Sequence, residues 1–162
     1  MTYDNEVSIS MSARSQNEAF ARVAAAAFAA PLDPLIGELT EIKTAVSEAV
    51  TNAIIHGYEN DSSGVVLVTF RSSGDEIIIS VTDEGVGISD VEQAMTPLYT
   101  TKPELERSGM GFTVMQAFMD HVEVTSAAGR GTTVEMRKTL VKQGQKSDLD
   151  RLLTGLGGTG ER

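Results

Sequence analysis

The chain has 162 residues, about the size of one domain, and its 41% hydrophobic and 22% charged residues are ordinary for a globular protein. Acidic residues outnumber basic ones by 23 to 13, and the resulting formal net charge of −10 argues against nucleic acid or an anionic membrane surface as the partner. The absence of cysteine excludes disulfide frameworks and cysteine nucleophiles, and the lack of a long apolar run or a signal-peptide-like start leads us to expect a cytoplasmic protein.

The first third of the chain predicts one strand and two helices. Apolar residues alternate with serines over residues 6–13, which is typical of a half-buried strand. Residues 15–18 have the pattern of a capping box at the start of an alanine-rich helix. We expect Asp33 to cap a second helix, with Pro34 at its first position and Gly57 at its C-terminal end.

The rest of the chain predicts two hairpins and two helical segments. The β-rich segments are 64–71, 76–83, 121–126 and 132–140. A short helical piece is expected at 90–95 and a longer helix at 109–119, with an irregular polar stretch, 96–108, between them. Strands that follow one another are mostly joined as hairpins. We therefore predict an α+β fold, a two-layer α/β sandwich with a mixed, mostly antiparallel sheet and helices on one face.

The C-terminal segment, 142–162, is glycine-bearing and has little periodicity. We expect it to be a disordered tail. The predicted domain is therefore 1–141.

The second helix combines a core face with a polar stripe. At about 100° per residue the following apolar residues share one arc: Ile42, Val46, Ala49, Val50, Ala53 and Ile54. Glu48, Asn52 and His56 are spaced by four and form a stripe beside it. An amide oxygen suits Mg²⁺, and a carboxylate one turn earlier could accept a proton. From this helix alone a solvated face is the more frequent explanation, and His56 is expected to meet the helix dipole.

Two glycine-bearing segments could contact a ligand. Asp83 ends a buried strand, where a carboxylate can accept a hydrogen bond from a base amino group, and Gly85 and Gly87 would let the backbone approach a planar ligand. A plain turn would also explain this pattern. Residues 108–113, Ser-Gly-Met-Gly-Phe-Thr, open a helix and could seat phosphate. They match neither a dinucleotide-binding fingerprint nor a P-loop.

Two further groups of residues could complete such a site. Thr101, Lys102 and Arg107 precede the glycines, and cations there suit polyphosphate, although solvated loop charge is the alternative. A threonine hydroxyl at Thr132, at the start of the last strand, could complete a base pocket or merely end the turn.

Taken together, the order and spacing of these motifs resemble the GHKL (Bergerat) ATP-binding fold of gyrase, histidine kinases and related ATPases. Within that group, residues 41–58 and 98–112 look like the sporulation anti-sigma-F factor family, and the similarity extends over 5–140. Members of that family are homodimeric serine kinases. They bind a sigma factor and phosphorylate an anti-anti-sigma protein with Mg²⁺ and ATP, giving ADP.

The resemblance implies a role for each motif. Glu48 would be the general base, Asn52 would hold Mg²⁺, Arg22 would lie on the partner-binding surface, and residues 96–108 would form a lid. The residues implied at the nucleotide are Asn52, Asp83, Gly85, Gly87, Thr101, Lys102, Arg107, Ser108, Gly109, Met110, Gly111, Phe112 and Thr132.

Three alternatives stay open at this point. The first is an ATP-driven clamp in which Glu48 activates water, although such machines carry further domains. The second is an ATP-gated binding module without kinase activity. The third is the related stress-response switch kinase, which acts on another sigma factor.

Overall fold

The computed structural model describes residues 2–97 and 110–141. The strands are β1 (Asn5–Ser12), β2 (Val65–Ser73), β3 (Glu76–Asp83), β4 (His121–Ser126) and β5 (Thr132–Thr139). The helices are α1 (Gln16–Ala29), α2 (Ile36–Asn52), α3 (Val91–Ala94) and α4 (Gly111–Phe118). A 3₁₀ turn, Ala30–Leu32, follows α1, and a π-helical turn, Ala53–Gly57, continues α2.

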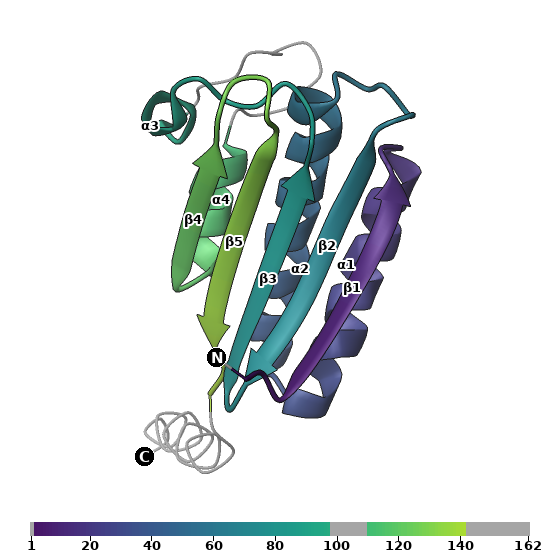
Figure 1. Ribbon diagram of the computed structural model, residues 1–162. Coiled ribbons are helices and arrows are strands. Elements are labelled where there is room, and N and C mark those ends of the chain that lie inside the picture. Colours follow the sequence, from purple (N-terminus) through teal and green to yellow (C-terminus); the bar gives the residue numbers. More distant parts are fainter. Residues whose placement is uncertain (1, 98–109, 142–162) are drawn as a thin grey trace, which may run out of the picture.

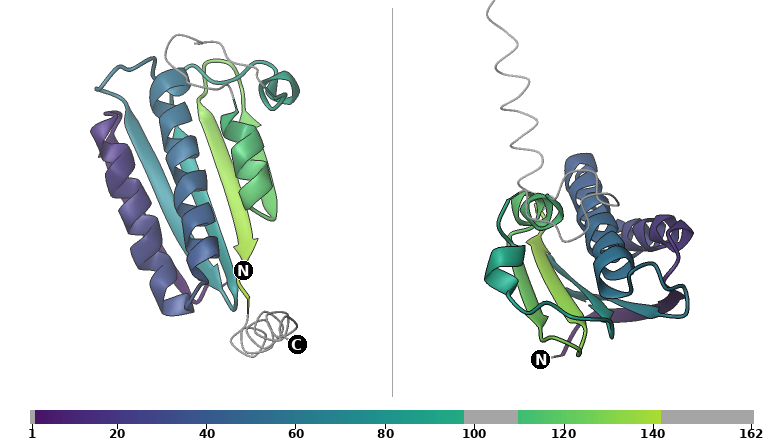
Figure 2. Two further views of the ribbon diagram at one scale, coloured as in Figure 1. Left: turned by 180° about the vertical axis from the view of Figure 1, so that it is seen from behind. Right: turned by 90° about the horizontal axis from the view of Figure 1, so that it is seen from above.

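The strands form one sheet in the order β1-β2-β3-β5-β4. The helices α1, α2 and α4 lie side by side on one of its faces (Figures 1 and 2). The predicted two-layer α+β fold is confirmed. The expectation of a mixed sheet is wrong, because all four pairings in the described chain are antiparallel. The long connection between β3 and β4 lets β5 pair with β3 and leaves β4 at the edge.

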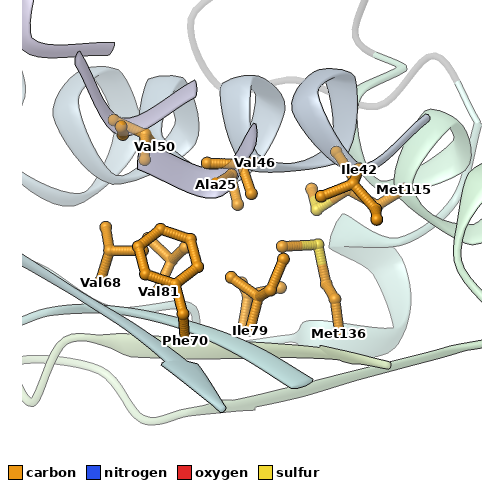
Figure 3. Close-up of a cluster of buried hydrophobic side chains, with 14 of the residues drawn as sticks. Ala25, Ile42, Val46, Val50, Val68, Phe70, Ile79, Val81, Met115 and Met136 are labelled. Atoms are coloured by element: carbon orange, nitrogen blue, oxygen red, sulfur yellow. The ribbon is translucent and has the colours of Figure 1, made fainter. Parts of the chain in front are cut away.

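The core lies between the sheet and the three helices (Figure 3). All six residues on the predicted inner face of the second helix are buried, so that prediction is confirmed. The strands contribute alternate residues such as Phe70, Ile79 and Met136, and α4 contributes Met115. Burying these side chains removes apolar area from water, at about 25 cal/mol per Å², and holds α2 and α4 over the sheet.

Both predicted N-terminal caps are wrong. Ser15 has helical backbone angles, and within the described chain its side chain makes no capping hydrogen bond. Asp33 ends the 3₁₀ turn in the left-handed conformation, at φ 51°, so α2 begins only after the extended residue Leu35. The carboxylate of Glu38 caps α2 instead, because its Oε2 accepts the backbone N–H of Leu35 at 2.7 Å.

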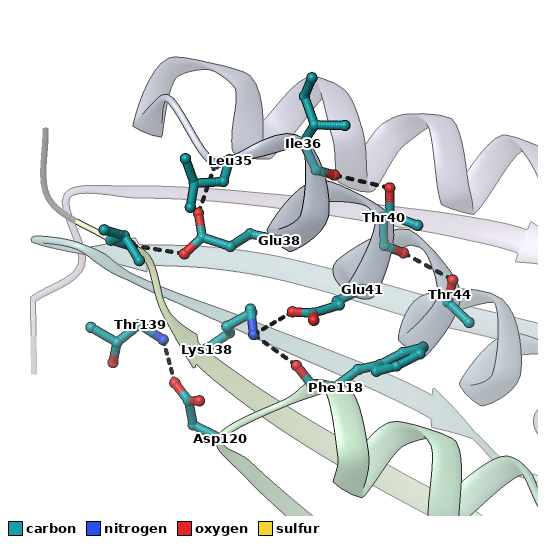
Figure 4. Close-up of polar contacts among 11 residues, drawn as sticks. Leu35, Ile36, Glu38, Thr40, Glu41, Thr44, Phe118, Asp120, Lys138 and Thr139 are labelled. Atoms are coloured by element: carbon teal, nitrogen blue, oxygen red, sulfur yellow. Dashed lines mark hydrogen bonds and ion pairs between the residues drawn. The ribbon is translucent and has the colours of Figure 1, made fainter. Parts of the chain in front are cut away.

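A cluster of polar contacts joins the first turns of α2 to the end of α4 and to β5 (Figure 4). The Nζ of Lys138 donates to the carbonyl oxygen of Phe118 at 2.8 Å and pairs with Glu41 Oε2 at 2.8 Å. The Oε1 of Glu38 accepts the backbone N–H of Val141 at 2.8 Å. These contacts hold α2 and α4 at the ends opposite to Asn52 and Gly111.

Candidate functional site

A cavity of about 410 Å³ opens where α2, β3 and α4 meet. Its walls come from the end of α2 and its π-helical turn, the end of β3 with the loop after it, α3, the first turn of α4 and the start of β5. This volume suits a small-molecule ligand. Six residues predicted from the sequence line it: Asn52, Asp83, Gly87, Gly111, Phe112 and Thr132.

Asp83 is a buried carboxylate in the cavity wall. It is the last residue of β3, pairs in register with Thr132 of β5, and is 5% exposed. Its Oδ1 accepts the backbone N–H of Gly85 at 2.9 Å. Burial raises the pKa of this carboxyl, while hydrogen bonds from the backbones of Gly85 and Thr132 act in the opposite direction. A desolvated carboxylate in a cavity wall binds a ligand hydrogen-bond donor strongly.

Glycines let the backbone pack directly around this carboxylate. A Cβ at Gly57 would lie 2.7 Å from the Asp83 carboxylate, and a Cβ at Gly85 would overlap the carbonyl oxygen of Gly57. That same oxygen accepts the backbone N–H of Val86 at 2.9 Å. Gly87 has φ 71°, in the left-handed region where side chains are disfavoured. The loop after β3 is therefore packed closely against Gly57, at the end of the π-helical turn that follows α2.

The polar stripe of α2 meets the first turn of α4. A Cβ at Gly111 would lie 3.1 Å from Glu48 Oε2 and 3.2 Å from Asn52 Oδ1. A glycine at this position thus brings a carboxylate, a carboxamide and a helix N-terminus together. Asn52 lines the cavity. Glu48 is half-buried and lies one helical turn before Asn52 on α2. The set offers a hard oxygen ligand, a proton acceptor and N–H donors.

Some predicted residues are not at the cavity wall, and others lie outside the described residues. Among the described residues, Glu48, Gly85 and Met110 are not in the lining; Gly85 instead packs on the π-helical turn. The predicted lid, 96–108, lies almost wholly outside the described residues, and the predicted tail, 142–162, lies fully outside them. Five predicted nucleotide contacts also fall there: Thr101, Lys102, Arg107, Ser108 and Gly109.

Arg22 is on α1, away from the cavity walls. Its exposed guanidinium lies 3.7 Å from Glu18 Oε1, one helical turn earlier. The carboxylate of Glu18 also accepts the hydroxyl of Ser47 at 2.5 Å. Arg22 is therefore available at the protein surface and is separate from the ligand cavity.

Sequence reasoning missed part of the cavity wall. His56 lines the cavity, whereas we expected it only to meet the helix dipole. The loop residues Val86 and Ile88 and the α3 residues Gln93 and Ala94 also contribute. These residue types are not specific to ligand binding. Only their position soon after Asp83 in the sequence could have suggested that they line the cavity.

Two features are absent from the part of the chain that the structure describes. In residues 2–97 and 110–141, no group of three or more histidine and acidic side chains is arranged to hold a metal ion. Over the same ranges, none of the helices combines the length and apolar character that a bilayer crossing requires.

We predict that Asp83→Asn makes the ligand-free protein more stable at neutral pH. A carboxyl whose pKa is raised on folding above 3.8 contributes stability below that value and loses it as the pH rises through the folded pKa. Asparagine carries no charge at neutral pH, so its amide does not pay the free-energy cost of burying the ionised carboxylate. The difference in free energy of unfolding between variant and parent should therefore be largest near pH 7 and shrink toward pH 4.

Urea denaturation between pH 4 and pH 8 measures this difference. Asp61 provides a control of opposite sign, because hydrogen bonds from Ser63 lower its pKa. Asp61→Asn should therefore destabilise the protein at pH 7, and the loss should fade as the pH is lowered. An Asp83→Asn protein less stable than the parent at pH 7 would contradict the prediction.

The chain matches known proteins over almost all of its described length. The family model for the histidine kinase-like ATPase domain matches residues 11–138. The chain is 61% identical over 138 residues to the anti-sigma F factor of Anoxybacillus flavithermus, covering 85% of this chain and 94% of that protein. It is 58% identical over 135 residues to the anti-sigma F factor of Clostridium beijerinckii, covering 83% and 94%.

Solved structures share the fold at low sequence identity. The RsbU and RsbW domains of Rv1364c from Mycobacterium tuberculosis give a TM-score of 0.60 at 21% identity, over 84% of this chain and 32% of that one. The catalytic domain of the histidine kinase ThkA gives 0.51 at 19% identity, over 63% and 68%. These likenesses concern the fold alone.

Proposed function

Because this chain belongs to the histidine kinase-like ATPase domain family, and within it to the anti-sigma F factors, we propose that it is an anti-sigma factor with protein-serine kinase activity. It binds a sigma factor of the sigma-F type and withholds it from RNA polymerase. It uses Mg²⁺ and ATP to phosphorylate a serine of an anti-anti-sigma protein, and it works as a homodimer.

One observation carries the kinase part of this proposal. Glu48 and Asn52 both lie against Gly111 beside a cavity that has the buried Asp83 in its wall. This arrangement suits an adenine nucleotide. The Asp83 carboxylate can accept a hydrogen bond from the adenine, the Asn52 amide oxygen can bind a metal ion, and the helix start at Gly111 can bind phosphate. Glycines at 57 and 85 remove the side chains that would displace this carboxylate and the loop beside it.

Each residue has a distinct part in the proposed reaction. Asn52 would hold Mg²⁺, which compensates phosphate charge. Glu48 would accept the proton of the substrate serine hydroxyl as the serine oxygen bonds to the γ-phosphorus. The bond from that phosphorus to the β–γ bridging oxygen breaks, and ADP leaves. The first turn of α4, at Gly111, would direct backbone N–H groups at phosphate oxygens. Asp83 would accept a hydrogen bond from the amino group of the adenine base.

Incubation with labelled ATP, Mg²⁺ and a candidate anti-anti-sigma protein tests the proposal. The label should appear on one serine of that protein, located by mass spectrometry. Release of free phosphate without a labelled protein would favour an ATPase. Binding of ATP with neither product would favour a nucleotide-gated binding module.

We predict that Arg22→Ala weakens binding of both the sigma factor and the anti-anti-sigma protein by about tenfold to a hundredfold, because exposed arginines often anchor interfaces. Affinity for ATP should stay unchanged, since Arg22 is on α1, outside the cavity walls. Calorimetry with each partner measures this. Arg130→Ala, at the exposed turn between β4 and β5, is the charge-matched control. Normal capture of the sigma factor by the Arg22 variant would remove Arg22 from the interface.

A further inference from the structure

Ser126 makes three hydrogen bonds for which the proposed reaction has no use. It is the last residue of β4 and is half-buried. Its Oγ lies 2.8 Å from the carbonyl oxygen of Gly131, 2.8 Å from the backbone nitrogen of Ile88 and 2.9 Å from Thr132 Oγ1. Two of these partners, Ile88 and Thr132, line the cavity.

Counting protons fixes the direction of all three bonds. A hydroxyl has one hydrogen to donate and two lone pairs that accept. The Gly131 carbonyl can only accept, so Ser126 donates its hydrogen there, and the Ile88 N–H can only donate, so it occupies one lone pair of Ser126. The remaining lone pair faces Thr132, which must therefore donate its own hydroxyl hydrogen to Ser126.

This assignment sets the polarity of the cavity wall. With its hydrogen directed at Ser126, Thr132 Oγ1 can offer the cavity only a lone pair. Its register partner in β3 is Asp83, whose carboxylate also accepts. Two adjacent acceptors favour a ligand group with N–H donors, and they disfavour a carbonyl oxygen at the same place because two acceptors would then face each other.

We infer that Ser126 is a positioning residue that sets base preference: by holding Thr132 as an acceptor, it makes the cavity select a 6-amino purine over a 6-oxo purine. The inference rests on the proposed nucleotide-binding function and adds to it a determinant of base choice on the edge strand. Ser126 acts through Thr132 and does not itself line the described cavity wall.

Calorimetric dissociation constants for ATP and for inosine triphosphate test this inference. The parent should prefer ATP by about a hundredfold or more. Ser126→Ala frees the Thr132 hydroxyl to rotate and donate to a 6-oxo group, so the preference should fall by about tenfold. If Ser126 had a purely structural role, Ser126→Ala would weaken the binding of both nucleotides equally and leave the ratio of their dissociation constants unchanged.

Three variants complete the design. Thr132→Val removes the hydroxyl but keeps the Ser126 bonds to Gly131 and Ile88, and should also lower the ratio. It keeps the test available if Ser126→Ala does not fold. Thr132→Ser retains the donor and should keep the parent ratio. Thr125→Ala, exposed on the same strand, is the control.

Two outcomes would overturn the inference in distinguishable ways. A parent-like ratio in folded Ser126→Ala, or in Thr132→Val, overturns the inference about Ser126 while leaving the proposed function intact. A parent chain that binds neither nucleotide overturns the proposed function and this inference with it.

Discussion

Glu48→Gln is expected to reduce phosphoryl transfer to the anti-anti-sigma protein by about 10²- to 10⁴-fold, the usual contribution of a general base. Glutamine has nearly the same shape as glutamate, so the packing of α2 against Gly111 should persist, but its amide cannot take the serine proton. Affinity for ATP and for the sigma factor should stay close to that of the parent.

Single-turnover transfer of labelled phosphate, with calorimetry of ATP binding, measures these two effects separately. Glu123→Gln makes the same chemical change at an exposed position on β4 and should leave transfer unchanged. Equal losses of ATP binding and transfer in Glu48→Gln would mean that Glu48 has a structural role and is not the base.

Asn52→Ala is expected to lower Mg²⁺-dependent ATP affinity by at least about a hundredfold. Loss of even an outer-shell partner of a metal site typically costs 10- to 100-fold in metal affinity, and Asn52 is proposed as a direct ligand. The change also leaves a gap beside Gly111, where the amide now packs. Binding measured without Mg²⁺ should fall much less.

Calorimetry with and without Mg²⁺ distinguishes these contributions. Gln116→Ala removes a carboxamide from the exposed side of α4 and should bind ATP like the parent. A parent-like affinity of Asn52→Ala in the presence of Mg²⁺ would contradict the metal assignment.

Local patterns in the sequence were sufficient to predict most of the helices and strands. The inner face of α2 and the alternation in β1 follow from the periods of 3.6 and 2, which depend only on neighbouring residues. The spacing of Glu48 and Asn52 likewise places them on one stripe of one helix. The predicted cap of α2 is wrong, because Asp33 adopts a left-handed conformation that ends the preceding turn, and the helix begins only after Leu35, whose N–H Glu38 accepts.

Only the tertiary structure decided how distant segments meet. The antiparallel pairing of β3 with β5 puts Asp83 opposite Thr132, and the packing of α4 on α2 puts Gly111 against Glu48 and Asn52. Ser126 reaches Thr132 and Ile88 because β4 pairs with β5 at the sheet edge. Strand order and helix packing depend on burying apolar surface from the whole chain, and no local period encodes them.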